Sequence, residues 1–315
     1  MQEGNNLSCF LNNLKTSLPD LAGIILGGNV MCEWCTEHGK GKKWYLAVEN
    51  YVRNFSELDD WLKEWNSNYR TVQAKLWGPV SAEMDALKSR LSPRLEKLAD
   101  EDWEEGFSKY HSAQTVTTDE AKEMCDVAGE NGGFVKLACT CRKYKRGGKY
   151  IGPENTYCLG ISAYTSMYHE HPERIWKEHK IETVSTEEVK EHLEKLSDEG
   201  LCHQASYIGS PGYMSKLCSC EYPVCVWLQW RLDWGIKGIL KKGHYVSSMD
   251  MDKCTGCGEC IKVCQFNAIT YSPTYGKAIF KQDKCFGCAQ CMRVCPEEAV
   301  TMLEREKIPS LKEDW

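Results

Sequence analysis

A cysteine spacing that occurs twice near the C-terminal end constrains this chain more than any other feature. The pattern C-x2-C-x2-C-x3-C runs from Cys254 to Cys264 and again from Cys285 to Cys295, and both copies open with Asp-Lys-Cys-x-Gly-Cys. Each copy closes with a similar apolar triplet, Ala-Ile-Thr or Ala-Val-Thr. A duplicated unit of this kind predicts two related halves that share one core.

The spacing itself predicts what the cysteines bind. Three closely spaced thiolates form a tight loop around a cluster, and the fourth reaches across to the other cluster of the pair. Two zinc sites or eight buried thiols are the alternatives, but zinc favours two ligand pairs separated by a longer loop. We therefore expect two [4Fe–4S] clusters, cluster 1 on Cys254, Cys257, Cys260 and Cys295, and cluster 2 on Cys285, Cys288, Cys291 and Cys264.

With these residues, the region from about Lys253 to Pro296 resembles the bacterial-type two-cluster ferredoxin domain. Cys295 is followed by Pro296, as that family's pattern has it, whereas Cys264 is followed by Gln265 where the family usually has proline. The resemblance implies a ferredoxin-like fold and a role in electron transfer. The departure at Gln265 leaves the ligands intact, because proline is not a ligand, but it can change the potential of the nearby cluster.

The remaining composition fits a cytoplasmic protein with metal-bound thiols. Nineteen cysteines are an odd number, and the N-terminus has neither a basic start nor a long apolar stretch, so secretion and a disulfide framework are not expected. No apolar run approaches the roughly 18 residues of a membrane-spanning helix. The net charge of −6 argues against a nucleic-acid surface.

We expect an α+β protein with three regions. Residues 1–110 read as a mainly helical N-terminal docking region, 111–248 as a cysteine-rich mixed α/β domain, and 249–315 as the ferredoxin-like two-cluster domain with a charged tail. Apolar residues at helical spacing predict a helix over 44–69. A length of 315 residues is consistent with two or three domains.

Local signals place further elements in the middle region. Thr118 is expected to cap a helix that ends near Gly129, and the apolar residues 134–138 predict a strand leading into Cys139. Ser185 and Glu188 form a capping-box pattern that opens a second helix, which Gly200 closes.

A second group of cysteines lies in loops of the middle region, in two C-x-C pairs with two further thiols. A C-x-C pair can direct both thiolates at one metal. A third iron–sulfur cluster, a zinc site and unliganded thiols are the three alternatives. The favoured ligands are Cys139, Cys141, Cys158 and Cys220, with Cys218 and Cys225 as rivals for the last place.

Other cysteines and one histidine near this group have simpler interpretations. His203 is expected to be a hydrogen-bonded structural histidine rather than a ligand. Cys9, Cys125 and Cys202 are expected to act as small apolar residues.

A looser resemblance extends over about 111–303. It is to ferredoxin-containing redox proteins in which a C-x-C-R motif, a further cysteine, a helix and a cysteine cluster precede the two-cluster domain. The matching segments are Cys139 to Arg142, Ser185 to Leu196, Gly200 to His203, and Leu217 to Cys220. The cysteine cluster is thinner here than in that group, which leaves open which thiols bind metal.

The N-terminal region carries one more pair, Cys32-x-x-Cys35, with His38 close by in sequence. The pair indicates half of a metal site, and the other ligands would come from the middle region or from a partner chain. A redox dithiol and an inert pair are the alternatives.

These observations favour an electron-transfer subunit that relays electrons through [4Fe–4S] clusters to or from a partner oxidoreductase, as part of a complex. The alternative is a reductase in its own right, with a central cluster or cysteine-ligated metal acting on a small substrate. A redox-sensing protein is a weaker third possibility. The sequence contains no nucleotide-binding fingerprint.

Overall fold

The structure is a computed structural model. Contacts divide the chain into Met1–Val30 and Met31–Trp315, and the described residues all lie in the second unit. Those residues are 32–51, 111–137, 139, 141–142, 158–162, 165, 182–208, 213–233, 235 and 237–315.

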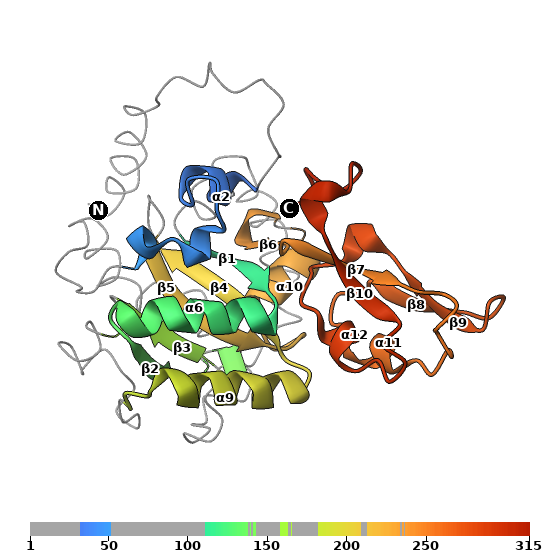
Figure 1. Cartoon of the computed structure of the whole chain (residues 1–315), viewed down its shortest axis with the longest axis horizontal. Helices are drawn as coiled ribbons and strands as arrows, with labels where there is room; N and C mark the ends of the chain where they lie inside the picture. Colours follow the sequence, from blue (N-terminus) through green and yellow to red (C-terminus); the bar gives the residue numbers. More distant parts are fainter. Residues whose placement is uncertain are drawn as a thin grey trace, which may run out of the picture. The chain divides into compact units, whose positions relative to one another are not determined.

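A six-stranded sheet organises the middle region (Figure 1). Its strand order is β2-β3-β5-β4-β1-β6, and neighbouring strands are antiparallel except for the parallel pair of β1 and β6. The strands are β1 (His111–Val116), β2 (Phe134–Leu137), β3 (Cys158–Ile161), β4 (Cys202–Ile208), β5 (Tyr213–Cys220) and β6 (Leu240–Lys241).

Two helices cover one face of this sheet, α6 (Thr118–Glu130) and α9 (Thr186–Asp198). Both begin with a capping box, which satisfies free backbone amides of the first turn. Ser185 and Glu188 form the box of α9 as expected, but α6 is capped by Thr117, one residue earlier than predicted. The Thr117 hydroxyl accepts from the Glu120 amide, and the Glu120 carboxylate accepts from the amide of Thr117.

Side chains alternate between the two faces of the strands, and this alternation separates two cores. On the helix-covered face, Val116, Ala205 and Leu217 pack with residues of α6 and α9. On the opposite face, Cys202 and Cys218 belong to a core that also includes α10 (Val226–Leu232) and residues of the C-terminal region.

The segment 32–51 packs into the helix-covered core. It consists of α2 (Glu33–Glu37) and two 3-10 turns, η2 (Trp44–Leu46) and η3 (Val48–Asn50). The long helix predicted to begin at Trp44 is therefore wrong over 44–51. Extended backbone at Ala47 separates the two turns, and the Asn50 amide donates to the carbonyl of Trp44 at 2.6 Å. The remainder of that predicted helix, 52–69, lies outside the described residues.

The duplicated C-terminal sequence folds into two matching halves, each a cysteine loop, a short helix and a strand. The first half contains α11 and β8, and the second contains α12 and β10. β7 pairs with β10 and β8 pairs with β9, both antiparallel. The elements are β7 (Tyr245–Met249), α11 (Glu259–Val263), β8 (Ile269–Ser272), β9 (Lys277–Phe280), η9 (Gln282–Lys284), α12 (Gln290–Arg293), β10 (Val300–Glu304) and η10 (Arg305–Lys307), preceded by η8 (Lys237–Ile239).

Polar contacts hold this C-terminal region against the middle region. The Gln290 amide donates to the carbonyl of Leu201 at 2.6 Å, and the Arg293 guanidinium pairs with Asp198 and Glu194 of α9. The predicted boundaries at 110 and 248 remain predictions, although the pairing of β7 with β10 already begins at Tyr245.

Candidate metal centres

Four cysteines from the two halves line one cavity of the C-terminal region. Cys254, Cys257 and Cys260 come from the first copy of the repeat and Cys295 from the second. Burial raises the pKa of Cys260 to about 11. A thiol with such a pKa is neutral at pH 7 unless a cation favours its thiolate form.

The loop of this cavity depends on Gly256. Its backbone has φ +76°, and an added Cβ would lie 2.1 Å from the carbonyl oxygen of Gly276. Glycine is therefore required both by the left-handed conformation and by the close backbone approach.

A second cavity has the reciprocal composition. Cys285, Cys288 and Cys291 come from the second copy of the repeat and Cys264 from the first. The backbone amide of Ser247 donates to the Cys285 sulfur at 3.4 Å. Burial raises the pKa of Cys291 to about 12. The structure thus gathers the eight repeat cysteines into the two groups of four that the spacing predicts.

The middle cysteines lie together on the face of the sheet opposite α6 and α9. Cys158 of β3 pairs with Cys218 on the neighbouring strand β5, so both lie on this face. Cys220 lies on the same face, two residues further along β5. Cys139 and Cys141 are contributed by the segment after β2, and Cys225 is the N-cap of α10.

Each of these six thiols interacts with two others of the group, so together they form a closed ring. The ring runs in the order Cys139, Cys141, Cys225, Cys220, Cys218, Cys158 and back to Cys139. Sequence reasoning favoured four of the six and treated Cys218 and Cys225 as rivals, whereas the structure brings all six together.

The direction of the pKa shift alternates around the ring. Hydrogen bonds from the two neighbouring thiols lower the pKa of Cys139 and of Cys218. Burial opposes ionisation of Cys225, but hydrogen bonds from Cys141 and Cys220 lower its pKa to about 5. Interactions with the neighbouring thiols raise the pKa values of Cys141, Cys158 and Cys220.

Two polar side chains on the ring's border suit an anionic metal–thiolate centre. Arg142, which is 2% exposed, places its backbone amide 3.4 Å from the Cys139 sulfur, and its guanidinium bonds Glu221. The side-chain nitrogen of Gln204 is buried and has no hydrogen-bond partner, while its oxygen accepts from the Cys220 thiol. An unpaired buried amide donor is costly, and a bound sulfide or thiolate would accept from it.

The neighbouring residues that we expected to be structural are placed accordingly. His203 lies on the helix-covered face, with its two ring nitrogens bonded to Ser197 and Ser219. Cys125 is buried in the helix-covered core. Cys202 is buried beside the ring, where its thiol contacts the carbonyl of Cys220. Cys9 lies outside the described residues.

The six-cysteine ring and the second cavity share one apolar core. Cys139, Cys141, Cys218, Cys220 and Cys225 pack in it with Cys285, and Cys158, Cys264 and Cys288 lie against it. The core also includes Trp227, Trp230 and the stacked rings of Phe266 and Phe286.

Gln265 forms a polar link across this core. Its side-chain nitrogen donates to the carbonyls of Gly200 and Cys220, at 2.7 and 3.3 Å, and its oxygen accepts from the Tyr222 amide at 2.8 Å. Gln265, which stands where proline was expected, thus connects the backbone directly after Cys264 with the backbone of Cys220 and Tyr222 at the ring. Sequence reasoning missed this role, because nothing in the local pattern indicates the partner.

Cys32 and Cys35 form a further group with His244, which lies between β6 and β7. His38, the histidine near the pair in sequence, is not part of this group. His244 carries no sequence signal that would have singled it out.

Comparison with known proteins identifies the class of the C-terminal region. Residues 247–302 match the family model of a 4Fe-4S dicluster domain. This domain indicates at least one iron–sulfur cluster and suggests iron–sulfur electron transfer. No curated protein matches the chain. Within the part of the chain that the structure describes, no helix is both long and apolar enough to cross a membrane.

Proposed function

We propose that this protein is an electron-transfer protein with three iron–sulfur centres, which passes electrons between a redox partner and the six-cysteine ring. Such clusters, when bound, exchange single electrons at potentials set by their ligands, charge and hydrogen bonds. The dicluster domain forms the outer part of the path, and the ring forms its buried end.

The observation that carries this proposal is the apolar core common to the ring and the second cavity. Short, dry contact between neighbouring centres suits electron transfer, because little solvent must reorganise and no water-filled gap intervenes. The first cavity continues the series, since Cys260, Cys264, Cys291 and Cys295 pack in one further core between the two halves.

The ligand sets follow from the two cavities. Cluster 1 would be held by Cys254, Cys257, Cys260 and Cys295, and cluster 2 by Cys264, Cys285, Cys288 and Cys291. In each set the fourth thiol comes from the other copy of the repeat, so neither half can complete its cluster alone.

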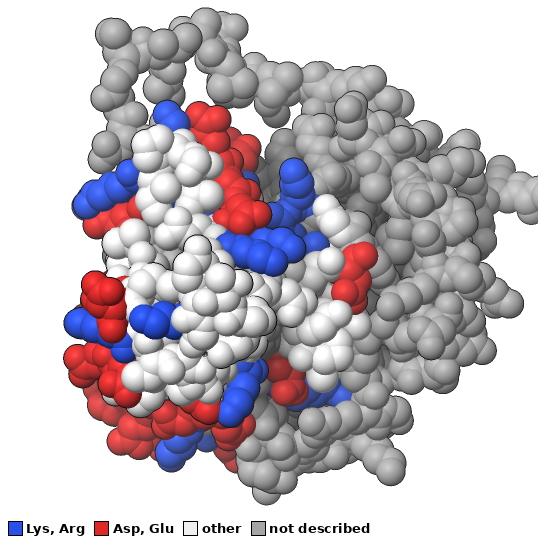
Figure 2. Space-filling view, turned by 90° about the vertical axis from the view of Figure 1, so that its right-hand side faces the viewer, with Lys and Arg blue, Asp and Glu red and all other residues white. Residues whose placement is uncertain are grey.

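The partner would exchange electrons at cluster 1. Cys257 is the one exposed cysteine among those in the described residues. Figure 2 turns towards the reader the side of the molecule on which β7–β10 lie, where Lys and Arg side chains lie among Asp and Glu side chains around uncharged surface. A protein donor or acceptor, such as a catalytic oxidoreductase subunit, would dock there.

The third centre would occupy the six-cysteine ring. Three observations support a metal cluster there: the convergence of six thiols, the buried guanidinium of Arg142, and the unpaired amide nitrogen of Gln204. Six thiols are two more than one cubane uses. Between zinc and iron–sulfur, the apolar contact with the cluster 2 cavity favours the redox-active choice.

Iron and sulfide quantification on the anaerobically purified full chain tests this proposal. About twelve iron atoms or more per chain are expected, against about eight if only the dicluster domain is loaded. The double variant Cys158→Ser with Cys218→Ser should fall to about eight. The variant Cys125→Ala, a buried cysteine away from the ring, should keep the full content. Eight iron atoms in the unaltered protein would overturn the third centre.

A further inference from the structure

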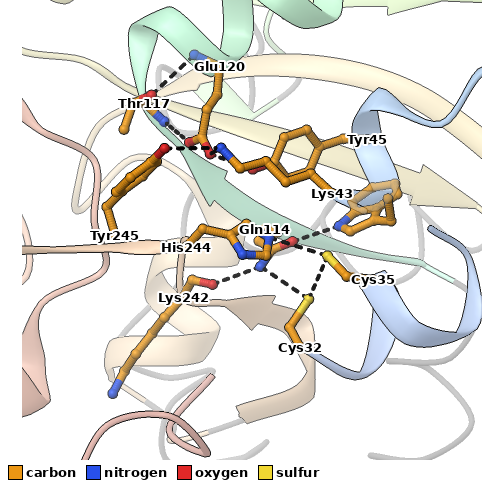
Figure 3. A network of polar contacts seen from close by, with 11 residues as sticks. Cys32, Cys35, Lys43, Tyr45, Gln114, Thr117, Glu120, Lys242, His244 and Tyr245 are labelled. Atoms are coloured by element: carbon orange, nitrogen blue, oxygen red, sulfur yellow. Dashed lines mark hydrogen bonds and ion pairs between the residues drawn. The ribbon is translucent and has the colours of Figure 1, made fainter. Parts of the chain in front are cut away.

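Three metal-binding atoms meet in a closed interior site that the electron path does not use. The Cys32 and Cys35 sulfurs are 3.1 Å apart, and the Cys35 sulfur lies 3.3 Å from Nε2 of His244 (Figure 3). Both thiols are 0% exposed and His244 is 6% exposed. The three atoms all lie within 4.8 Å of one another.

The side chains come from segments that are distant in sequence. Cys32 is the N-cap of α2, Cys35 lies in its first turn, and His244 precedes β7. The first turn of α2 brings the two cysteines close together, because the Cys32 carbonyl accepts hydrogen bonds from the amides of Cys35 and Thr36 at 2.9 and 3.1 Å.

Gln114 of β1 supports the site from behind (Figure 3). Its side-chain oxygen accepts from the indole of Trp44 at 2.6 Å, and its nitrogen donates to the carbonyl of Lys242 at 2.9 Å. These bonds fix which way the amide faces, so its nitrogen is also directed at the Cys32 sulfur, 3.8 Å away. An amide donor facing a sulfur is the type of outer contact that orients and stabilises a metal thiolate.

Burial distinguishes a metal site from a redox dithiol. Reactive cysteines are partly exposed, because a disulfide partner must reach the attacking sulfur. Neither thiol here is exposed, and aromatic rings enclose the histidine, with Tyr45 and Trp315 centred 5.8 and 5.3 Å from it. An ion needs no such access once it has bound during folding.

We propose that Cys32, Cys35 and His244 bind one zinc ion. Two thiolates and an imidazole are ligands that zinc favours, and the cation would neutralise thiolates that are otherwise costly to bury. Tetrahedral zinc separates two sulfurs by about 3.8 Å and a sulfur from a nitrogen by about 3.6 Å. The sulfurs would therefore move apart by several tenths of an ångström on binding. The described part of the chain supplies three ligands, and the fourth position takes water or another donor.

The ion would join the N-terminal segment to the loop that supports cluster 2. The amide of Gly243 donates to the carbonyl of Phe286 at 2.9 Å, and the Arg305 amide donates to the carbonyl of His244 at 2.8 Å. The Arg305 side chain in turn bonds the carbonyl of Cys285 at 2.7 Å. The zinc site is thus a structural clamp next to the dicluster domain rather than a member of the electron path.

Zinc content and cobalt spectra of the anaerobically purified full chain test the proposal. We expect one zinc per chain in the unaltered protein, in Cys125→Ala and in Cys218→Ser, and less than about a fifth of a zinc in Cys35→Ser. Cobalt(II) in place of zinc should give thiolate charge-transfer bands that are lost in Cys35→Ser and shifted in His244→Ala. Gln114→Leu should weaken zinc binding by about 10- to 100-fold.

The iron count separates this proposal from the proposed function, since zinc should be lost in Cys35→Ser while iron is retained. A zinc-free protein as purified, or a zinc content that Cys35→Ser leaves unchanged, would overturn the site. A Cys32–Cys35 disulfide found by mass spectrometry in the anaerobic protein would also overturn it. If Cys35→Ser does not fold, cobalt titration of the chelator-treated unaltered chain tests instead whether the site binds a metal ion.

Discussion

The side-chain amide of Gln265 donates a hydrogen bond to the backbone carbonyl of Cys220 at 3.3 Å. Gln265 follows Cys264 of the cluster 2 cavity directly, and Cys220 belongs to the six-cysteine ring. One side chain therefore connects the backbones of two groups of thiols, whose members Cys220 and Cys264 are 44 residues apart in sequence. A proline at this position would remove this donor from the carbonyls of Cys220 and Gly200.

Gln265→Ala should destabilise the protein without removing iron. The change deletes three hydrogen bonds, each worth about 0.5–1.5 kcal/mol, so a loss of about 1.5–4.5 kcal/mol is expected. Hydrogen exchange should report faster opening at Cys220 and Tyr222, with the iron content unchanged. Exchange that stays the same at these amides would contradict the role of Gln265 as a link.

Gly256→Ala should disrupt cluster 1, and Gly258→Ala is its matched control. Both glycines have positive φ, which costs an alanine about 1–2 kcal/mol. Only at Gly256 does the added Cβ also collide with backbone, the carbonyl of Gly276, whereas the space at Gly258 is open. We expect loss of about four iron atoms in the first variant and retention in the second. Equal iron contents in both variants would contradict this account of the loop.

Arg142→Met should lower the reduction potential of the ring centre. Arg142 carries a buried positive charge that interacts electrostatically with Cys139, and its removal disfavours adding an electron, by on the order of 100 mV. Arg142→Lys keeps the charge and should shift the potential much less. Redox titration followed by EPR checks both values. If the Met and Lys variants shift equally, the effect is steric rather than electrostatic.

Stability should fall with acidity because of His203. Burial lowers the pKa of this histidine to about 3 in the folded chain, whereas the unfolded value is about 6.5. The unfolded chain thus binds the proton first, and stability present above about pH 6.5 is lost as the pH falls towards 3, by up to about 1.4 kcal/mol per pH unit. His203→Gln should lack this component when unfolding free energies are compared between pH 7 and 5. Parallel slopes for the two proteins would contradict it.

The grouping of the C-terminal cysteines could be predicted from sequence because most members of each group are local. Three of the four thiols at each cavity fall within seven residues, so the spacing alone brings them together. The capping box of Ser185 was similarly local and is confirmed, while the cap of α6 was misplaced by one residue because Thr117 and Thr118 are both plausible caps.

The ring and the group of Cys32, Cys35 and His244 could be predicted only in part. Cys218 and Cys158 meet because β3 and β5 pair in one particular register, and sequence patterns do not specify the register between strands so far apart. His244 joins Cys35 across 209 residues, and a lone histidine gives no signal of this kind. Long-range pairing, rather than residue type, limited the prediction.

The reduction rate of the ring centre by a reduced protein donor tests the central claim most directly. A protein donor cannot reach the buried ring, so electrons should enter near Cys257 and continue past Cys285. Freeze-quench EPR should show reduction of the ring centre in the unaltered chain and in Cys125→Ala. In Cys285→Ser, the ring centre should be reduced at least about 10-fold more slowly, with its iron retained. An unchanged rate in Cys285→Ser would contradict a path through cluster 2.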